Sequence, residues 1–311
     1  MKGLKKIALC SAVALAPFAA NADLKALNDS DMSSVTGQAG VTIDLSADIS
    51  IGEIAYEDQG FLAISDVTLG GAAPGTSLDD IRLTIDVAGD GSDLGVPAFG
   101  ATYLTGAGFT INGVTEVDQA VSDGDLVIAL RSQSGTPVDF GLSIGEIALS
   151  QSSNSGSIGS LNSAAGNVGT VLVSNLNIVG AIGPVDIVVQ EETNAMNINA
   201  YFNASAGLTT PDIGDGLEMP FLGTSLDFEL HNRRGASVVS AGGGAVSFAH
   251  AQIDVGVAED YLGADQDALR VTVQDFSGDL DLLNISPGAV SIGSIYMTDL
   301  AVTADMKIYG H

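Results

Sequence analysis

The sequence predicts an all-β fold, either a β-sandwich or an irregular, solenoid-like stack of long amphipathic strands. Three observations support this class: apolar residues at every second position, turn residues between these runs, and the lack of long helical patterns. The clearest run has apolar residues at Val41, Ile43, Leu45, Ala47, Ile49 and Ile51, separated by Thr42, Asp44, Ser46, Asp48 and Ser50. Successive side chains of a strand point to opposite faces, so one face here is apolar and the other carries hydroxyls and carboxylates.

The same alternation recurs along the chain, at residues 81–87, 138–144, 196–202, 226–230 and 269–273. Turn-forming pairs separate the runs, among them Gly70-Gly71, Asp90-Gly91, Asn112-Gly113, Asp123-Gly124, Ser134-Gly135 and Asp215-Gly216. Residues 151–168 are rich in Ser, Asn and Gly and predict a long loop or a weak strand region. One short helical pattern runs from Leu24 to Val35 and ends at Gly37, where a C-cap glycine is expected.

Two short phrases are repeated in the same order. Ser-Ile-Gly-Glu-Ile-Ala occupies residues 50–55 and again residues 143–148. A second phrase, apolar, hydroxyl, Asp or Asn, apolar, occurs at residues 64–69, 173–178 and 297–302, each time after a Ser-Ile-Gly phrase. The pair predicts a reused strand–corner–strand unit, although its irregular spacing differs from that of a strict solenoid repeat.

The N-terminus has the pattern of a secretory signal peptide. Lys2, Lys5 and Lys6 precede an apolar stretch, and Ala20-Asn21-Ala22 is a small-x-small cleavage site. We therefore expect a signal peptide at residues 1–22, a short helical or linker segment at 23–40 and a single β domain at 41–311. Cleavage before Asp23 removes Cys10, the only cysteine, so the mature chain has no intrachain disulfide.

The mature chain is strongly acidic. Loss of the three signal lysines leaves seven of the ten basic residues against 38 acidic ones, a formal charge of −31. Nucleic acid and anionic lipid are poor partners for such a chain, because the cations that neutralise phosphate are scarce. We expect export to the periplasm, the outer surface or the medium, no transmembrane helix in the mature chain, and partners among envelope or surface proteins, including further copies of the chain.

Acidic loops are the candidate metal ligands. Asp86, Asp90 and Asp93 form the first group, and calcium is the metal that such flexible carboxylate loops suit. Asp118, Asp123 and Asp125 form a second group, and Asp212, Asp215 and Glu218 a third. None has the complete spacing of an EF-hand, and acidic turns explain them more simply than calcium does. No other cofactor is expected.

Catalytic patterns are weak. The paired carboxylates Glu191 and Glu192, or Asp227 and Glu229, could flank a sugar, but the chain has no Trp to line a sugar cleft. On a strand, Asp227 and Glu229 share the face opposite Leu226 and Phe228, which indicates a solvated outer face. The three histidines, His231, His250 and His311, lack the spacing of zinc ligands. We therefore expect no enzymatic activity.

The ends of the chain resemble a known group of proteins. The stretch from Leu24 to Ile43 contains Met32-Ser33-Ser34-Val35-Thr36-Gly37-Gln38-Ala39-Gly40, and the chain closes with Met306-Lys307-Ile308-Tyr309-Gly310-His311. Both segments resemble exported Gram-negative proteins of a pilus system, the Fil type. The resemblance implies a surface or fimbria-associated role and implies no active site.

The sequence therefore predicts an exported structural or adhesive protein of the cell surface, associated with pili or fimbriae. The edge of a β-sheet can pair with another chain, and residues 41–51 are our candidate for that exchange, although pairing within the protein's own sheet explains them more simply. A calcium- or ligand-binding β module is the first alternative. An outer-membrane β-barrel and a carbohydrate-active enzyme are the further alternatives that the sequence leaves open.

Overall fold

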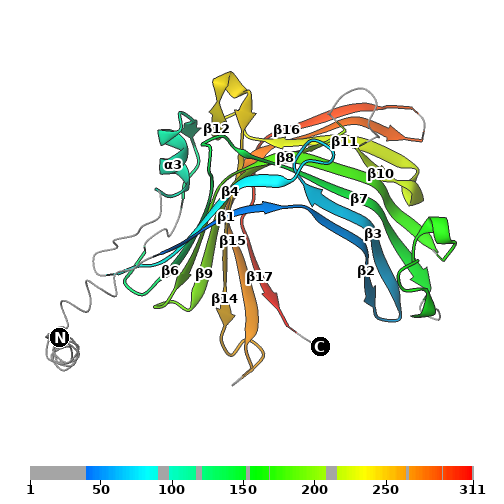
Figure 1. Ribbon diagram of the computed structural model, residues 1–311, viewed down its shortest axis with the longest axis horizontal. Coiled ribbons are helices and arrows are strands. Elements are labelled where there is room, and N and C mark those ends of the chain that lie inside the picture. Colours follow the sequence, from blue (N-terminus) through cyan, green and yellow to red (C-terminus); the bar gives the residue numbers. More distant parts are fainter. Residues whose placement is uncertain are drawn as a thin grey trace, which may run out of the picture. The chain divides into compact units, whose positions relative to one another are not determined.

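The computed structural model describes residues 40–89, 98–116, 121–151, 155–167, 169–207, 216–263, 266–288 and 290–309 (Figure 1). Its contacts divide the chain into two compact units, Met1–Ala39 and Gly40–His311, and all the described residues belong to the second. The expected signal peptide and the short helical segment lie outside the described residues, except for Gly40.

The described part of the chain is mainly β-structure, which confirms the predicted all-β class. The strands are β1 (Val41–Ala47), β2 (Ile49–Glu57), β3 (Gly60–Gly70), β4 (Leu78–Val87), β5 (Thr110–Asn112), β6 (Leu126–Ser132), β7 (Val138–Gln151), β8 (Thr170–Gln190), β9 (Ala195–Ala206), β10 (Leu217–Met219), β11 (Thr224–His231), β12 (Val238–Ala241), β13 (Val246–Ser247), β14 (Ala249–Ala258), β15 (Ala268–Pro287), β16 (Gly293–Ala301) and β17 (Ala304–Ile308). The helical elements are α3 (Gly100–Gly106) and the 3₁₀ turns η2 (Ser155–Ser157), η3 (Ser163–Ala165), η4 (Pro220–Leu222) and η5 (Gly242–Gly244). Among the described residues, no helix has the length and apolar character needed to cross a bilayer.

Most strands join one antiparallel sheet that forks into two branches. The first branch has the order β1-β4-β6-β8-β9-β14-β15-β17, and the second has the order β2-β3-β7-β8-β10-β11-β15-β16. The long strands β8 and β15 belong to both branches, because each pairs with one set of neighbours along its first half and with another set along its second half. The main sheet is a single branched sheet, whose two branches diverge in Figure 1.

The chain from Val41 to Glu57 follows one edge of both branches. β1 pairs with β4 and β2 with β3, and in the described residues neither has a strand on its other side. The alternation predicted one continuous strand over residues 41–51, whereas the structure interrupts it at Asp48, where the chain passes from one branch to the other.

The repeated phrases form a crease across the second branch. Asp66 and Asn175, the corner residues of two copies of the second phrase, both have left-handed backbones, with φ of 55° and 52°. In register, Asp66 lies between Gly52 of β2 and Gly145 of β7, and a Cβ at Gly145 would lie 2.9 Å from the Asp66 Cβ. A left-handed residue shifts the two-residue alternation by one position, and glycine leaves room for the resulting bend. The repeats therefore confirm the predicted strand–corner–strand unit.

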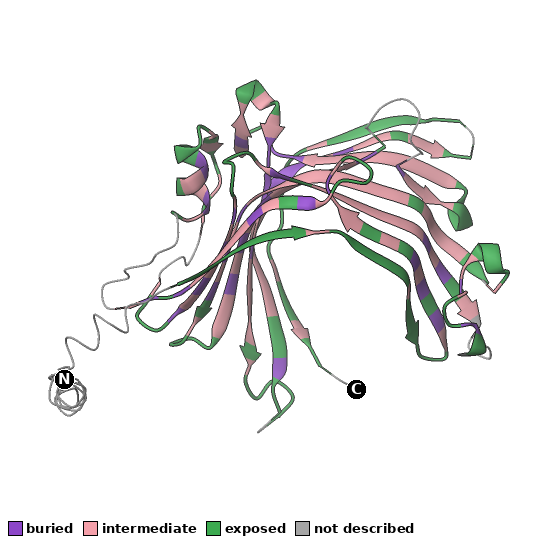
Figure 2. Ribbon diagram, in the orientation of Figure 1, coloured by how far each residue is buried: buried purple, intermediate pink, exposed green. Residues whose placement is uncertain are grey.

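Some of the buried apolar residues form three small clusters. One joins Leu104 of α3 to Tyr201, Val239 and Phe248, and it fixes α3 and the small β13-β12-β5 sheet on the main sheet. A second joins Phe61 and Ala63 to Leu161 of the Ser/Gly-rich segment. The third, Leu78, Ile81 and Val138, lies at the fork. Figure 2 shows how sparse buried residues are along most strands.

Candidate functional site

The centre of the polar face of the first branch is buried, whereas Asp44 and Asp305 at its sides are exposed. Across β4, β6, β8, β9 and β14, register aligns Thr84, Ala129, Asp186, Asn199 and Gln252, and the last four are at most 1% exposed. Buried polar groups are costly unless they are hydrogen-bonded, so this face must contain connected polar networks.

The first network centres on the carboxylate of Glu116, a residue that the alternation of apolar residues does not assign to any strand. The Glu116 Oε1 accepts hydrogen bonds from Asn199 Nδ2 (2.9 Å), the Tyr201 hydroxyl (2.8 Å) and the backbone N–H of Ala101 (2.6 Å). Burial, together with the charge of Glu116, raises the pKa of Tyr201 well above its ordinary value, so the phenol is neutral and donates. The contact fixes the start of α3 over the sheet.

The same network includes a buried ion pair. Arg131 Nη2 lies 2.5 Å from Asp186 Oδ1, and both side chains are at most 2% exposed. The other Asp186 oxygen accepts the N–H of Gly100 at 2.9 Å, which satisfies one of the free N–H groups at the start of α3. Burial raises the pKa of Asp186, and Arg131 and Gly100 oppose that shift without cancelling it. Arg131 also lies over the Tyr103 ring, 5.0 Å from its centroid.

His250 closes this network on β14. Its Nε2 is 2.6 Å from Asn199 Oδ1, its Nδ1 is 3.0 Å from Asp275 Oδ2, and its ring lies against Tyr201. Burial lowers the pKa of His250, while the neighbouring Asp275 acts in the opposite direction. Both ring nitrogens face oxygen atoms of Asn199 and Asp275, so His250 is not oriented toward a hydroxyl nucleophile.

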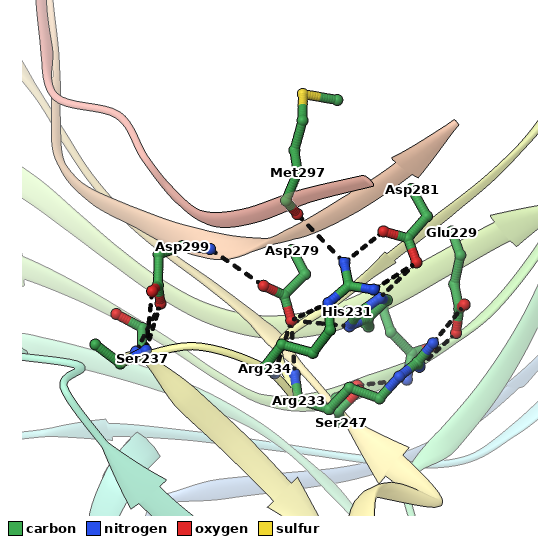
Figure 3. A network of polar contacts seen from close by, with 12 residues as sticks. Glu229, His231, Arg233, Arg234, Ser237, Ser247, Asp279, Asp281, Met297 and Asp299 are labelled. Carbon is green, nitrogen blue, oxygen red and sulfur yellow. Dashed lines mark hydrogen bonds and ion pairs between the residues drawn. The ribbon is translucent and has the colours of Figure 1, made fainter. Parts of the chain in front are cut away.

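A second polar network joins β11, β15 and β16 in the second branch (Figure 3). His231 lies opposite Asp279 in the β-ladder, and Glu229 lies opposite Asp281. The His231 Nδ1 is 3.1 Å from Asp279 Oδ2, outside hydrogen-bond geometry, and its Nε2 is 3.3 Å from Asp281 Oδ2. The ring is 1% exposed, so carboxylates flank a buried histidine.

Two arginines from the segment after β11 neutralise these carboxylates. Arg233 makes two parallel 2.6 Å bonds to Glu229, and Arg234 holds Asp281 in the same two-bonded way. The Arg233 guanidinium lowers the pKa of Glu229. Burial acts to raise the pKa of Asp281, but hydrogen bonds from Arg234 and His231 outweigh it and hold the pKa below its ordinary value.

Backbone contacts complete this network. The N–H groups of Arg233 and Arg234 donate to Asp279 Oδ2 at 3.0 and 2.9 Å. Asp299, the corner residue of the third copy of the second phrase, accepts N–H bonds from Ala236 and Ser237. These backbone bonds lower the pKa of Asp299. The network therefore fastens the segment between β11 and β12 to β15 and β16.

Glu229, His231 and Asp281 have the composition of a metal site. Their potential ligand atoms lie within 4.8 Å of one another, and one histidine with two carboxylates suits zinc. Each carboxylate, however, is already held by two guanidinium N–H groups, so a metal would have to displace Arg233 and Arg234. The donor set fits a closed ion-pair network better than it fits a metal, and Figure 3 shows this arrangement.

The residues predicted for calcium do not form a site in the described part of the chain. Asp86 lies in β4, is 3% exposed and accepts the N–H of Val87 at 2.9 Å, while Asp90 and Asp93 lie outside the described residues. Of the other acidic groups, Asp118, Asp212 and Asp215 also lie outside. Asp125 accepts backbone N–H bonds from Ser122 and Glu191, and Glu218 accepts a hydrogen bond from Ser174, so both have structural contacts.

The candidate carboxylate pairs are either exposed or engaged in contacts within the protein. Glu191 and Glu192 lie exposed in the turn between β8 and β9. Asp227 accepts bonds from Asn284 and the N–H of Gly216, and Glu229 belongs to the ion-pair network. His311 lies outside the described residues. Calcium binding and the absence of catalysis both stay predictions.

The other face of the first branch is apolar, and of its side chains Leu83 and Leu130 pack against the buried cluster of Leu78, Ile81 and Val138. One row, aligned by register, contains Val41, Ile85, Ile128, Ile187, Ile198, Ile253, Val273 and Ala304. The rows on either side contain Ile43, Leu83, Leu130, Val185, Ala200, Ala251 and Phe276, and Val87, Leu126, Val189, Met196, Val255, Val271 and Met306. We call these three rows the apolar face; none of its members is buried.

The comparisons with known proteins leave the function open. Residues 1–89 match a family model described as a family of unknown function, DUF6160, and this range includes the N-terminal segment and all of β1 to β4. No curated protein and no solved structure gives a significant match to the chain. The similarity therefore includes the edge strands β1 and β2 but brings no substrate, ligand or partner.

Proposed function

We propose that this protein is an exported structural protein of the cell surface, which acts by binding another protein chain and catalyses no reaction. The apolar face carries the proposal. Soluble monomers rarely expose a continuous apolar patch larger than about 300–600 Å², and larger patches mark interaction sites. Here 22 aligned side chains are apolar, and among the described residues none of them is buried.

The sheet edge gives independent support for assembly. In the described residues, β1 and β2 pair on one side only, and exposed apolar side chains such as Val41 (54%) and Ile54 (44%) lie along them. A free edge can accept a strand from another chain, as in fibre-forming surface proteins. The signal-peptide pattern and the resemblance to pilus-system proteins fit the same role.

The polar networks support a role without catalysis. His231 and His250 each face oxygen atoms on both ring nitrogens, and the guanidinium groups of Arg233 and Arg234 engage the nearby carboxylates. These contacts fasten loops to the sheet. The calcium-binding alternative has less support, because Asp86 is buried in a strand.

Cell fractionation with a matched pair of variants tests this function. Ile43→Glu places a charge on the apolar face of β1, and Thr42→Glu places the same charge on the opposite face of the same strand. We expect wild type and Thr42→Glu to remain on intact cells, where added protease reaches them, and Ile43→Glu to be released into the medium. Wild-type chain found in the cytoplasm, or equal retention of both variants, would contradict the proposal.

A further inference from the structure

We propose that the apolar face binds the same face of a second copy of this chain, so that two first branches pack sheet to sheet. This inference rests on the proposed function and names its partner. In such a dimer the same surface serves both copies, which is the usual arrangement of a two-fold homodimer. The result is a β-sandwich across the interface, with inner side chains interdigitating in a layer about 10 Å thick.

The composition of the apolar face suits binding to the same face of a second copy. All 22 side chains of its three rows are apolar, and most are Val, Ile or Leu. Exposure is greatest around its border, at Val41 (54%), Val87 (48%) and Met306 (44%), and most interior side chains are half-buried. Obligate homodimer interfaces are apolar in this way, like a domain core cut in half.

The area is sufficient for a stable dimer. The first branch has eight strands, β1-β4-β6-β8-β9-β14-β15-β17. At about 4.8 Å between strands and about 3.3 Å per residue, three rows on eight strands cover roughly 650 Å², or about 1,300 Å² for two copies. Specific protein interfaces bury about 1,200–2,000 Å² in total, so the face reaches that class.

Charge favours a second copy even though the chain is acidic. The strand carboxylates of the first branch, including Asp44, Asp254 and Asp305, lie on the opposite face, because register places them beside Arg82 and Thr272. Sheets packed about 10 Å apart would hold these outer charges about 20 Å from those of the partner. That separation exceeds the Debye length of about 8 Å at physiological ionic strength, so repulsion across the interface is weak.

The pairing of the basic side chains argues against a lipid membrane as the partner of the apolar face. Within the described ranges, every basic side chain is paired with a carboxylate: Arg82 with Asp44, Arg131 with Asp186, Arg233 with Glu229, Arg234 with Asp281, and Arg270 and Lys307 with Asp305. An anionic headgroup beside the apolar face would have to compete with these carboxylates. The apolar face of a second copy is uncharged, so its binding requires no free basic side chain.

The first measurement is the mass of the chain from Asp23 onward, by light scattering and sedimentation without detergent. We expect twice the sequence mass over a wide concentration range. Adding charges at two border positions, Ile43→Glu with Met306→Glu, should weaken dimerisation by about 100-fold or more, because the charges would be buried without partners. Thr42→Glu adds charge on the other face of β1 and should leave the dimer intact. Circular dichroism confirms that each variant is folded.

Cross-linking identifies the face. The mature chain lacks cysteine, so Ile198→Cys introduces a single thiol near the centre of the apolar face, and Thr272→Cys introduces one on the polar face. A short bis-maleimide reagent should join two copies through the Ile198→Cys thiols and not through the Thr272→Cys thiols. Equal cross-linking of both variants would overturn face-to-face packing.

Three outcomes separate this inference from the proposed function. A dimer broken by the border charges and cross-linked through Ile198→Cys supports it. A monomer at every concentration overturns it, and if intact cells still retain wild type but release Ile43→Glu, the proposed function stands with a different partner chain. A monomer that binds phosphatidylcholine vesicles through the apolar face overturns both.

Discussion

The two faces of the first branch differ in both polarity and burial. Register rows on one face, such as Ile128–Ile187–Ile198, are entirely apolar, yet none of these side chains is buried in the part of the chain that the structure describes. The neighbouring row on the other face, including Asp186 and Asn199, is polar and almost completely buried. Burial in this sheet therefore follows what is placed over each face rather than the polarity of the face. Hydrogen-bond networks stabilise the covered face, and the proposal above assigns a partner chain to the other.

The buried ion pair provides the strongest way to break this arrangement. Asp186→Ala leaves the Arg131 guanidinium buried without its carboxylate and frees the N–H of Gly100, so we expect a loss of about 3–5 kcal/mol in the free energy of unfolding. Urea unfolding followed by circular dichroism measures it. Asp44→Ala, which removes an exposed partner of Arg82, is the control and should change stability within error. Equal losses in both variants would mean that the polar face is not covered as the structure shows.

The sequence predicted the sides of each strand but not which side is covered. Alternation at residues 41–51 separates apolar from polar side chains because a strand has a two-residue period. The cover of the polar face comes from α3 and Glu116, and no local pattern connects Glu116 to Tyr201, 85 residues away. One signal was available: Asn197, Asn199, Tyr201 and Asn203 alternate with apolar residues, and uncharged amides on a strand fit burial better than solvent exposure does.

The candidate site, too, could be predicted from the sequence only in part. Asp227 and Glu229 were predicted to share a face, which strand geometry dictates, but the Arg233 contact that engages Glu229 depends on how the chain turns after β11. The pairing of His231 with Asp279 joins strands 48 residues apart. The repeated phrases were more informative, because Asp66, Asn175 and Asp299 each adopt the left-handed conformation that a corner requires.

The stability that the second polar network provides should depend on pH. At pH 7, Asp281→Asn weakens charged hydrogen bonds to Arg234 and His231, and we expect a loss of about 1.5–3 kcal/mol. The pKa of Asp281 in the folded protein is below the ordinary value of 3.8, so its contribution is complete above that pH and is lost as the pH falls through the folded pKa.

The stabilities of wild type and Asp281→Asn should therefore converge between pH 5 and strongly acidic conditions. Urea midpoints measured at a series of pH values test this. A gap that stays constant down to the lowest pH would show that Asp281 does not depend on its charge. Asp186→Asn is an informative companion, because burial raises the pKa of Asp186 and the same convergence is not expected there.

We expect the smallest change in stability from removal of a single hydroxyl on the covered face, that of Tyr201. Tyr201→Phe keeps the ring against Leu104 and Phe248 but removes the hydrogen bond to Glu116, whose carboxylate keeps its bonds from Asn199 and Ala101. We expect a loss of about 1 kcal/mol, because the acceptor remains satisfied. Tyr296→Phe is the matched control, since Tyr296 is 62% exposed. If both variants unfold at the same urea concentration as wild type, the hydrogen bond from Tyr201 to Glu116 does not contribute to the stability of the covered face.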